Sequence, residues 1–180
     1  KKLLILLFSL FVSLGSYGEE IKSLFGIALY DNAEEYFSSD YINLNKYKYS
    51  ETNDDFYYLD ITYKIKTKSP YATDYKIIID NINRIHRVFG YSDFINLDIC
   101  HAVRKDILSK VEDKYETNFI FIERNYPKFS IYLNSNIDSA GNEYRIQCRF
   151  WNEDSSSALM VLLDSEVLAD SIHNFYNSGL

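Results

Sequence analysis

The sequence lacks the short motifs that mark the common kinds of active site. It has no Gly-x-Ser-x-Gly around a nucleophilic serine and no Walker loop or Gly-x-Gly-x-x-Gly for a nucleotide. Its three histidines, His86, His101 and His173, are far apart, and neither His-x-x-x-His nor Cys-x-x-Cys spacing occurs. We therefore expect no catalytic, cofactor-binding or metal-binding residues in the chain, and no cofactor.

Basic residues are scarce: 19 Lys and Arg stand against 26 Asp and Glu, a net charge of −7. Nucleic-acid binding depends on Lys and Arg that neutralise phosphates, so we expect no nucleic-acid partner. The same acidity argues against an anionic membrane surface. Aromatic residues are abundant, with 17 Tyr and 12 Phe. Sugar-stacking platforms are one explanation, but a coding bias toward AT-rich codons is favoured because Lys, Asn and Ile are plentiful too.

The first residues contain the one long uncharged run, Leu3–Leu14, which follows two lysines. Small residues stand at Ser16 and Gly18, a pattern typical of a signal peptide cleaved after Gly18. A membrane span needs about 20 apolar residues, so an uncleaved anchor is the less favoured alternative. We expect residues 1–18 to direct export to the periplasm or the extracellular space, with no stable membrane insertion after cleavage.

The rest of the chain, residues 19–180, has the length of a single domain that can bury a core without metal ions. It contains two cysteines, Cys100 and Cys148, and an exported protein can keep a disulfide. Cys100 falls in a predicted helix and Cys148 in a predicted strand. A bond between them would fasten the helix to the sheet, and the alternative is two buried, unpaired thiols.

The first part of this domain mixes short elements. Residues 26–31 predict a short strand that enters a helix, and the polar, Tyr-rich segment 38–55 predicts a loop or an extended arm. β-branched and aromatic residues predict a strand at 58–65. The runs 75–79 and 84–89 flank turn residues, and they predict a hairpin.

A long helix is predicted after Asp93, because apolar residues recur every three or four positions. The members of this stripe are Leu97, Cys100, Val103, Ile107, Val111 and Tyr115. Charged residues, Arg104 among them, are expected on the other faces of the helix. The expected N-caps of the three helices are Asp31, Asp93 and Asp164.

The last part of the chain predicts three strands, 129–133, 143–150 and 158–163, and a final helix. Alternation places Tyr144, Ile146, Cys148 and Phe150 on one face of their strand. The final helix has the stripe Leu168, Ile172, Phe175 and Tyr176. The expected fold is α+β: an antiparallel sheet of hairpins with two main helices on one face, plus a short N-terminal strand and helix.

Three features carry a resemblance to known proteins: the run Gly26-Ile-x-Leu29-x-Asp31, the hairpin between Ile77 and Phe89, and Cys100 in a helix that ends near Tyr115. The chain resembles small uncharacterised exported proteins of AT-rich marine bacteria, from which no functional residue can be transferred. It is also similar in arrangement to small envelope modules of the β-lactamase-inhibitor type. That second resemblance implies protein binding, by analogy of fold alone.

Two local groups of polar residues stand out. Asp98 and His101 lie three apart on the long helix, where a surface ion pair is favoured over a site. Arg84, His86 and Arg87 form a basic spot, read as a solvated strand face in preference to a site for an acidic group.

We expect a non-enzymatic module that binds an envelope or extracellular protein, or a small ligand, through the uncovered sheet face or segment 38–55. The alternative is a hydrolase whose site assembles from residues distant in sequence. A structural part of an envelope assembly is a third possibility.

Overall fold

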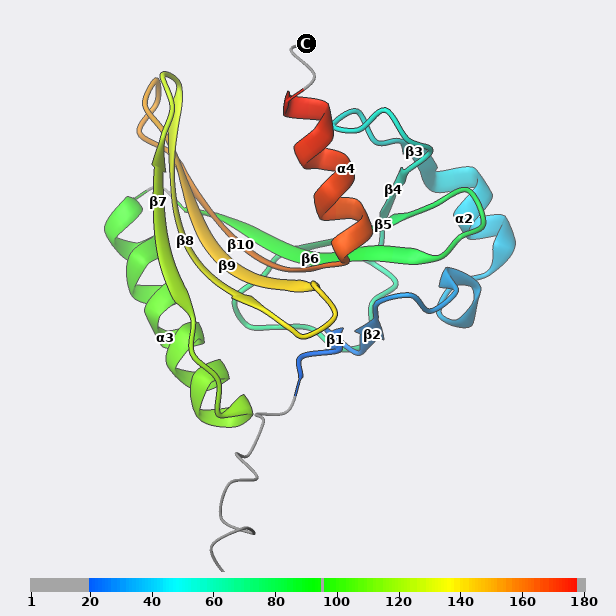
Figure 1. Ribbon diagram of the computed structural model, residues 1–180, viewed down its shortest axis with the longest axis horizontal. Coiled ribbons are helices and arrows are strands. Elements are labelled where there is room, and N and C mark those ends of the chain that lie inside the picture. The colour runs from blue at the N-terminus through cyan, green and yellow to red at the C-terminus, as the bar shows by residue number, and fades with distance from the viewer. Residues whose placement is uncertain (1–19, 95, 178–180) are drawn as a thin grey trace, which may run out of the picture.

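The computed structural model describes residues 20–94 and 96–177, and its centre is one antiparallel sheet of eight strands (Figure 1). Their order across the sheet is β3-β4-β5-β6-β10-β9-β8-β7. The strands are β3 (Lys46–Lys48), β4 (Tyr57–Asp60), β5 (Asp74–Ile79), β6 (Ile85–Phe94), β7 (Ile120–Asn125), β8 (Phe129–Ile137), β9 (Glu143–Trp151) and β10 (Ser157–Asp164). The expected signal peptide, residues 1–18, lies outside the described residues.

The remaining elements are a small hairpin and four helical segments. The hairpin pairs β1 (Ser23–Leu24) with β2 (Ile27–Ala28). The helices are the 3-10 turn η1 (Ala33–Glu35), α2 (Ser39–Asn45), α3 (Leu97–Tyr115) and α4 (Glu166–Asn177). Within the described residues, none of these helices combines the length and the apolar character that crossing a bilayer requires.

The antiparallel α+β fold predicted from the sequence is confirmed. Strands β3 to β6 run back and forth in chain order and lead into α3, and β7 to β10 do the same and lead into α4. The two groups meet where β6 pairs with β10 in the middle of the sheet. The hairpin expected at 75–89 is β5 and β6. Strand β7 is an element that the sequence analysis did not predict.

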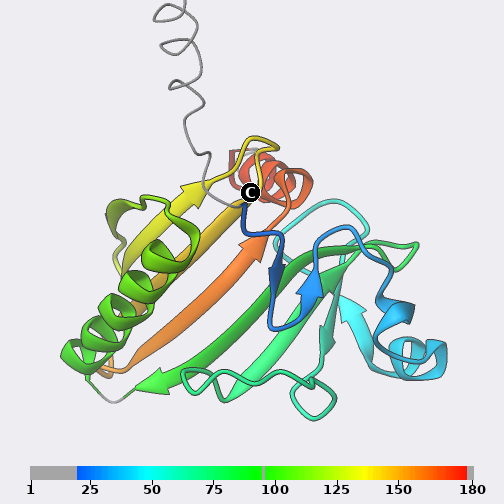
Figure 2. The same cartoon turned by 90° about the horizontal axis from the view of Figure 1, so that it is seen from below.

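The position of the two long helices differs from the expected arrangement on a single face: α3 and α4 lie on opposite faces of the sheet (Figures 1 and 2). On the α3 face, Cys100 and Ile107 belong to a buried cluster with Val161 of β10. On the α4 face, Leu168 belongs to a second cluster with Leu162. Successive strand residues point to opposite faces, and β10 is apolar on both, so each face needs a cover.

The two cysteines are bonded on the α3 face. Cys100 of α3 and Cys148 of β9 form a disulfide with a Cα–Cα distance of 6.0 Å, and both residues are fully buried. The helix stripe and the strand alternation bring these two side chains together, as the sequence patterns require. The disulfide fastens α3 to the sheet at the point where the helix covers it.

Segment 38–55 differs from the expected loop or arm, since it contains both α2 and β3. The Ser38 side chain accepts a hydrogen bond from the Tyr41 amide at 3.3 Å and caps α2, and Ile42 is fully buried. Strand β3 then pairs with β4 at the edge of the sheet. Tyr49, which follows β3, is also buried, so the segment is ordered by two buried side chains and a helix cap despite its polar composition.

The helix caps differ from the expected aspartates. The observed caps are Asn32, Asn96 and Ser165, in place of Asp31, Asp93 and Asp164. Asp93 is still part of β6, where it pairs with Ala158 of β10. Asp164 is likewise the last residue of β10, and its side chain bonds Arg87.

Candidate binding groove

The sheet curves so that β7, β8 and β9 rise beside α4 (Figure 1), and a groove of about 790 Å³ lies on this face. We call it the α4 groove. Its lining comes from six strands (β4 and β6 to β10), from α4 and from three loop residues (Tyr49, Glu51 and Tyr126): Tyr49, Glu51, Tyr58, Arg87, Phe89, Arg124, Tyr126, Phe129, Ile131, Leu133, Glu143, Arg145, Gln147, Arg149, Met160, Leu162, Asp164, Ala169, Ile172 and His173.

Strand alternation explains why this face is polar where the other is apolar. In β9 the side chains of Arg145, Gln147 and Arg149 line the groove, while Ile146 and Cys148 between them belong to the core on the α3 face. Gln147 pairs in register with Met160 of β10 and with Leu133 of β8. The strand therefore places a row of polar and basic side chains across an otherwise apolar floor.

Four arginines line the α4 groove of this acidic protein, and two of them are held by carboxylates. Arg87 donates from Nε and Nη2 to both carboxylate oxygens of Asp164, the second bond being 2.7 Å long. Arg145 donates to Glu143, with Nε 3.2 Å from Oε1. Among the described residues, Arg124 and Arg149 form no ion pair.

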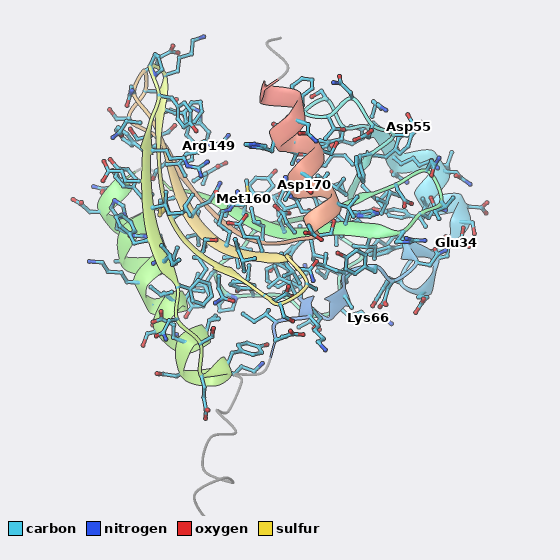
Figure 3. The ribbon with its side chains drawn as sticks, viewed as in Figure 1. Glu34, Asp55, Lys66, Arg149, Met160 and Asp170 are labelled. Atoms are coloured by element: carbon cyan, nitrogen blue, oxygen red, sulfur yellow. A yellow bond between two sulfur atoms is a disulfide. The ribbon has the colours of Figure 1, made fainter. Side chains whose placement is uncertain are left out.

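Arg149 lies over two neighbouring aromatic rings. Its guanidinium carbon lies 5.0 Å from the ring centroid of Phe129 and 5.9 Å from that of Trp151. Its Nε atom is buried and has no hydrogen-bond partner within the described part of the chain. Figure 3 labels Arg149 and Met160 on the same concave side of the sheet. The two rings hold the cation in place, and its donors are the part of the groove best suited to an anion.

The floor next to Arg149 is apolar. Leu133 and Leu162 are buried, and Met160 of β10 pairs with Tyr91 of β6 on one side and with Gln147 of β9 on the other. Tyr126 packs against Phe129, with ring centroids 4.7 Å apart, at the end of the groove that carries Arg149. An apolar floor with a few polar groups at fixed positions is the usual composition of a small-molecule site.

The titratable groups of the α4 groove do not form an acid–base pair. Burial alone would raise the pKa of the Glu143 carboxyl, but the bonds from Arg145 and Ser135 outweigh burial and lower it. Glu143 therefore stays ionised as the partner of Arg145 and does not serve as a proton donor near neutral pH. Burial also raises the pKa of the Tyr49 hydroxyl, which donates a hydrogen bond to Glu51 at 2.8 Å.

A serine, a histidine and an aspartate are in contact at the start of α4. Ser165 Oγ lies 2.9 Å from His86 Nδ1, and His86 Nε2 lies 3.2 Å from Asp80 Oδ2. A nucleophile, a base and an acid stand in this order in many hydrolases. However, Ser165 is 0% exposed, and its Oγ accepts the amide of Leu168 as the cap of α4. In this structure the serine is closed to solvent, and its contacts fasten the start of α4 to the sheet.

The basic spot of Arg84, His86 and Arg87 is only in part the solvated strand face expected from the sequence, because Arg84 is exposed and the other two are not. His86 and Arg87 are both buried, His86 against Ser165 and Arg87 in the α4 groove. Asp98 and His101 lie on α3, on the opposite face, and they form no ion pair with each other in the described residues. The sequence does carry a signal for the groove, because the alternation that makes one face of β9 apolar makes the other face basic.

Two further findings bear on function. No group of three or more His, Cys, Asp or Glu side chains in residues 20–94 and 96–177 is arranged to hold a metal ion. No protein-family model, curated protein or solved structure matches this chain.

Proposed function

We propose that this protein is an exported, non-enzymatic binding module that holds a small amphipathic anion in the α4 groove. The observation that carries the proposal is Arg149: its guanidinium lies over Phe129 and Trp151, its buried Nε has no partner among the described residues, and it borders an apolar floor. A ligand that combines one anionic group with an apolar body would satisfy both features at once.

The lining suggests how such a ligand would lie. Its anionic group would accept hydrogen bonds from Arg149, with the exposed Arg124 at the rim of the same groove. Its apolar body would cover Met160 and the buried side chains of Leu133 and Leu162. Burial of that apolar surface would supply most of the binding free energy, and the arginine would select for charge.

Export is part of the proposal. It is supported by the disulfide between Cys100 and Cys148, because disulfides persist in oxidising compartments and are rare in the cytosol. The signal-peptide pattern of residues 1–18 points the same way. The same anionic chemistry is offered by a free small molecule and by an anionic group carried on an envelope or extracellular protein.

The alternative is a hydrolase, and the contact between Ser165, His86 and Asp80 is the observation in its favour. A fluorophosphonate probe labels serines that act as nucleophiles. We expect no label on Ser165, because the residue is fully buried. If the wild type is labelled and a Ser165→Ala variant is not, the hydrolase is favoured over the binding module.

The groove is tested with a matched pair of dyes. One is 8-anilinonaphthalene-1-sulfonate, an aromatic anion, and the other is the neutral N-phenyl-1-naphthylamine. Trp151 is the single tryptophan of the chain and lies beside Arg149, so energy transfer from Trp151 reports bound dye, and the Arg149 variant tells whether the dye occupies this end of the groove. We expect both dyes to bind, the sulfonate more tightly.

An Arg149→Met variant should weaken binding of the sulfonate by about tenfold, since one charge-assisted hydrogen bond is lost, and should leave the neutral dye almost unaffected. The control is Lys66→Met, which removes an exposed cation on the other side of the sheet (Figure 3). Equal loss of sulfonate binding in both variants would show that net charge, and not the groove, attracts the dye.

A further inference from the structure

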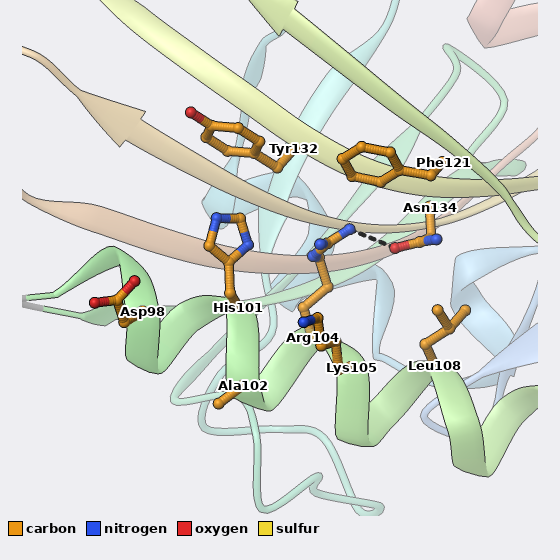
Figure 4. A pocket seen from close by; sticks show the side chains of 9 residues that line it. All are labelled: Asp98, His101, Ala102, Arg104, Lys105, Leu108, Phe121, Tyr132 and Asn134. Atoms are coloured by element: carbon orange, nitrogen blue, oxygen red, sulfur yellow. Dashed lines mark hydrogen bonds between the residues drawn. The ribbon is translucent and has the colours of Figure 1, made fainter.

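On the α3 face, the described residues include an arginine that is buried without a carboxylate partner. Arg104 of α3 is only 5% exposed, and its Nη1 donates to Asn134 Oδ1 of β8. Its guanidinium carbon lies 5.1 Å from the ring centroid of Phe121 on β7. Figure 4 shows the side chain rising from the helix toward Phe121 and Asn134. The sequence pattern had placed Arg104 on an outer face of this helix.

The charge of Arg104 is poorly compensated where it lies. Within the described residues it forms no ion pair, and its buried Nε has no hydrogen-bond partner. The guanidinium exchanges its hydrating water for one neutral amide oxygen and one aromatic ring. Burial therefore lowers the pKa of Arg104. A buried cation is normally paired with an anion, so the arrangement lacks a partner.

The surroundings of Arg104 form a cleft of about 750 Å³ between α3 and strands β7 and β8. His101 lies in this cleft one helical turn before Arg104, and its Nδ1 is also buried without a hydrogen-bond partner in the described residues. The His101 ring meets Tyr132 edge-on, with centroids 4.8 Å apart. Two nitrogen atoms without partners thus lie beside two aromatic rings (Figure 4).

We propose that this cleft is a second binding site, for the carboxylate of a small planar ligand, which accepts hydrogen bonds from Arg104 and contacts His101. A planar carboxylate fits the two parallel donors of a guanidinium. Tyr132 and Phe121 provide apolar surface for a flat ligand body. Phe121 is 52% exposed on the edge strand β7, so its ring can move aside to admit the ligand.

The other charges of the cleft favour a single negative charge over a double one. Lys105 adds a cation, whereas Asp98 lines the cleft and Glu123 of β7 acts on His101 from the strand side. Two carboxylates so near would repel a phosphate dianion more strongly than a monocarboxylate. The site is independent of the α4 groove, because the two lie on opposite faces of the sheet.

The test is a titration of ¹⁵N-labelled protein followed through the arginine Nε–H signals. The Arg104 signal is the one that disappears in an Arg104→Met variant and persists in Lys110→Met, a control on the same helix outside the cleft. If Arg104→Met does not fold, Phe121→Ala identifies the signal instead, since removing the neighbouring ring shifts that resonance.

Benzoate should shift the Arg104 signal in a saturable manner, benzyl alcohol should not shift it, and phenyl phosphate should need a higher concentration. The benzoate response should persist in Arg149→Met, which separates this site from the α4 groove. The proposal is overturned if benzoate leaves the signal unmoved, if benzyl alcohol shifts it equally, or if phenyl phosphate binds more tightly than benzoate.

Discussion

The two faces of the central sheet differ in how they are closed. On the α3 face, the disulfide and a continuous apolar cluster join the helix to the sheet, and the β1–β2 hairpin extends this cover. On the α4 face, the apolar cluster around Leu162 and Leu168 is smaller, and arginines and aromatic rings occupy the rest of the groove. Because one face supplies most of the core, the other can remain partly open to a ligand.

Arg149 and Arg104 both have a buried Nε without a hydrogen-bond partner among the described residues, and they lie toward the β7 edge of the sheet, one on each face. Strand β8 serves both: Phe129 stacks on Arg149, and Asn134 accepts a hydrogen bond from Arg104. The difference between the faces therefore fades toward β7, where neither helix seals the sheet completely. This end of the molecule is where ligands are expected.

The largest expected effect on stability comes from the buried ion pair between Arg87 and Asp164 in the lining of the α4 groove. Asp164 is 1% exposed and accepts two hydrogen bonds from Arg87. An Arg87→Met variant leaves a buried carboxylate without its partner and should lower the free energy of unfolding by about 3–5 kcal/mol. Urea denaturation at pH 7 measures the loss.

The matched control for that pair is the double variant Arg87→Met with Asp164→Leu, which removes both charges. It should recover most of the stability that the single variant loses, because the penalty comes from the uncompensated charge. If the double variant unfolds as readily as the single one, the attraction between the two charges is itself a main source of stability. The α4 face would then depend on this ion pair more than the comparison of the two faces implies.

A somewhat smaller effect is expected on the other face from the disulfide. The double variant Cys100→Ala with Cys148→Ala should lower the free energy of unfolding by about 2–4 kcal/mol, because the unfolded chain regains conformational freedom. Urea denaturation of the variant, beside wild-type protein with and without reductant, measures the loss. Binding of the naphthalene sulfonate in the α4 groove should remain, since the disulfide lies on the opposite face.

Mass spectrometry after alkylation complements that measurement. Both cysteines are buried, so the protein purified from its native host is alkylated in denaturant; it should gain no alkyl groups without reductant and two after reduction. The same spectrum reports whether residues 1–18 have been removed. Two alkylated thiols without reduction would show that the α3 face is closed by apolar contacts alone.

The sequence predicted the elements with strong periodicity. The helix stripe through Cys100 and the alternation through Cys148 are both present, and together they place the two cysteines in contact. The hairpin of β5 and β6 also followed from its residues. These predictions succeeded because each depends on local spacing that the fold does not override.

The relation between the helices could not be predicted from local spacing. An apolar stripe shows that a helix has a buried side but does not say which face of the sheet it covers. The decisive sequence feature was the run Ala158–Leu163, which is apolar at every position and therefore needs a cover on both faces. The buried Arg104 escaped prediction because its partners, Phe121 and Asn134, belong to strands far along the chain.

The smallest effect is expected from pH, and it acts at His86, where α4 joins the sheet. Burial lowers the pKa of His86 below its usual value, against the opposing effect of Asp80, and Arg84 lowers it further. The unfolded chain then takes up a proton before the folded chain does. The His86 contribution is therefore present above about pH 6.5 and lost as the pH falls below that value.

A His86→Gln variant separates this contribution from that of the carboxylates. The glutamine can still bond Ser165 or Asp80 but does not titrate, so its urea midpoint should fall less between pH 7.5 and pH 5.5 than that of the wild type, whatever their absolute stabilities. The disulfide variant should keep the wild-type slope, because His86 bonds the start of α4 and not α3. Parallel slopes for His86→Gln and wild type would mean that His86 protonates without opening this face, and that the α4 face responds to acid as the α3 face does.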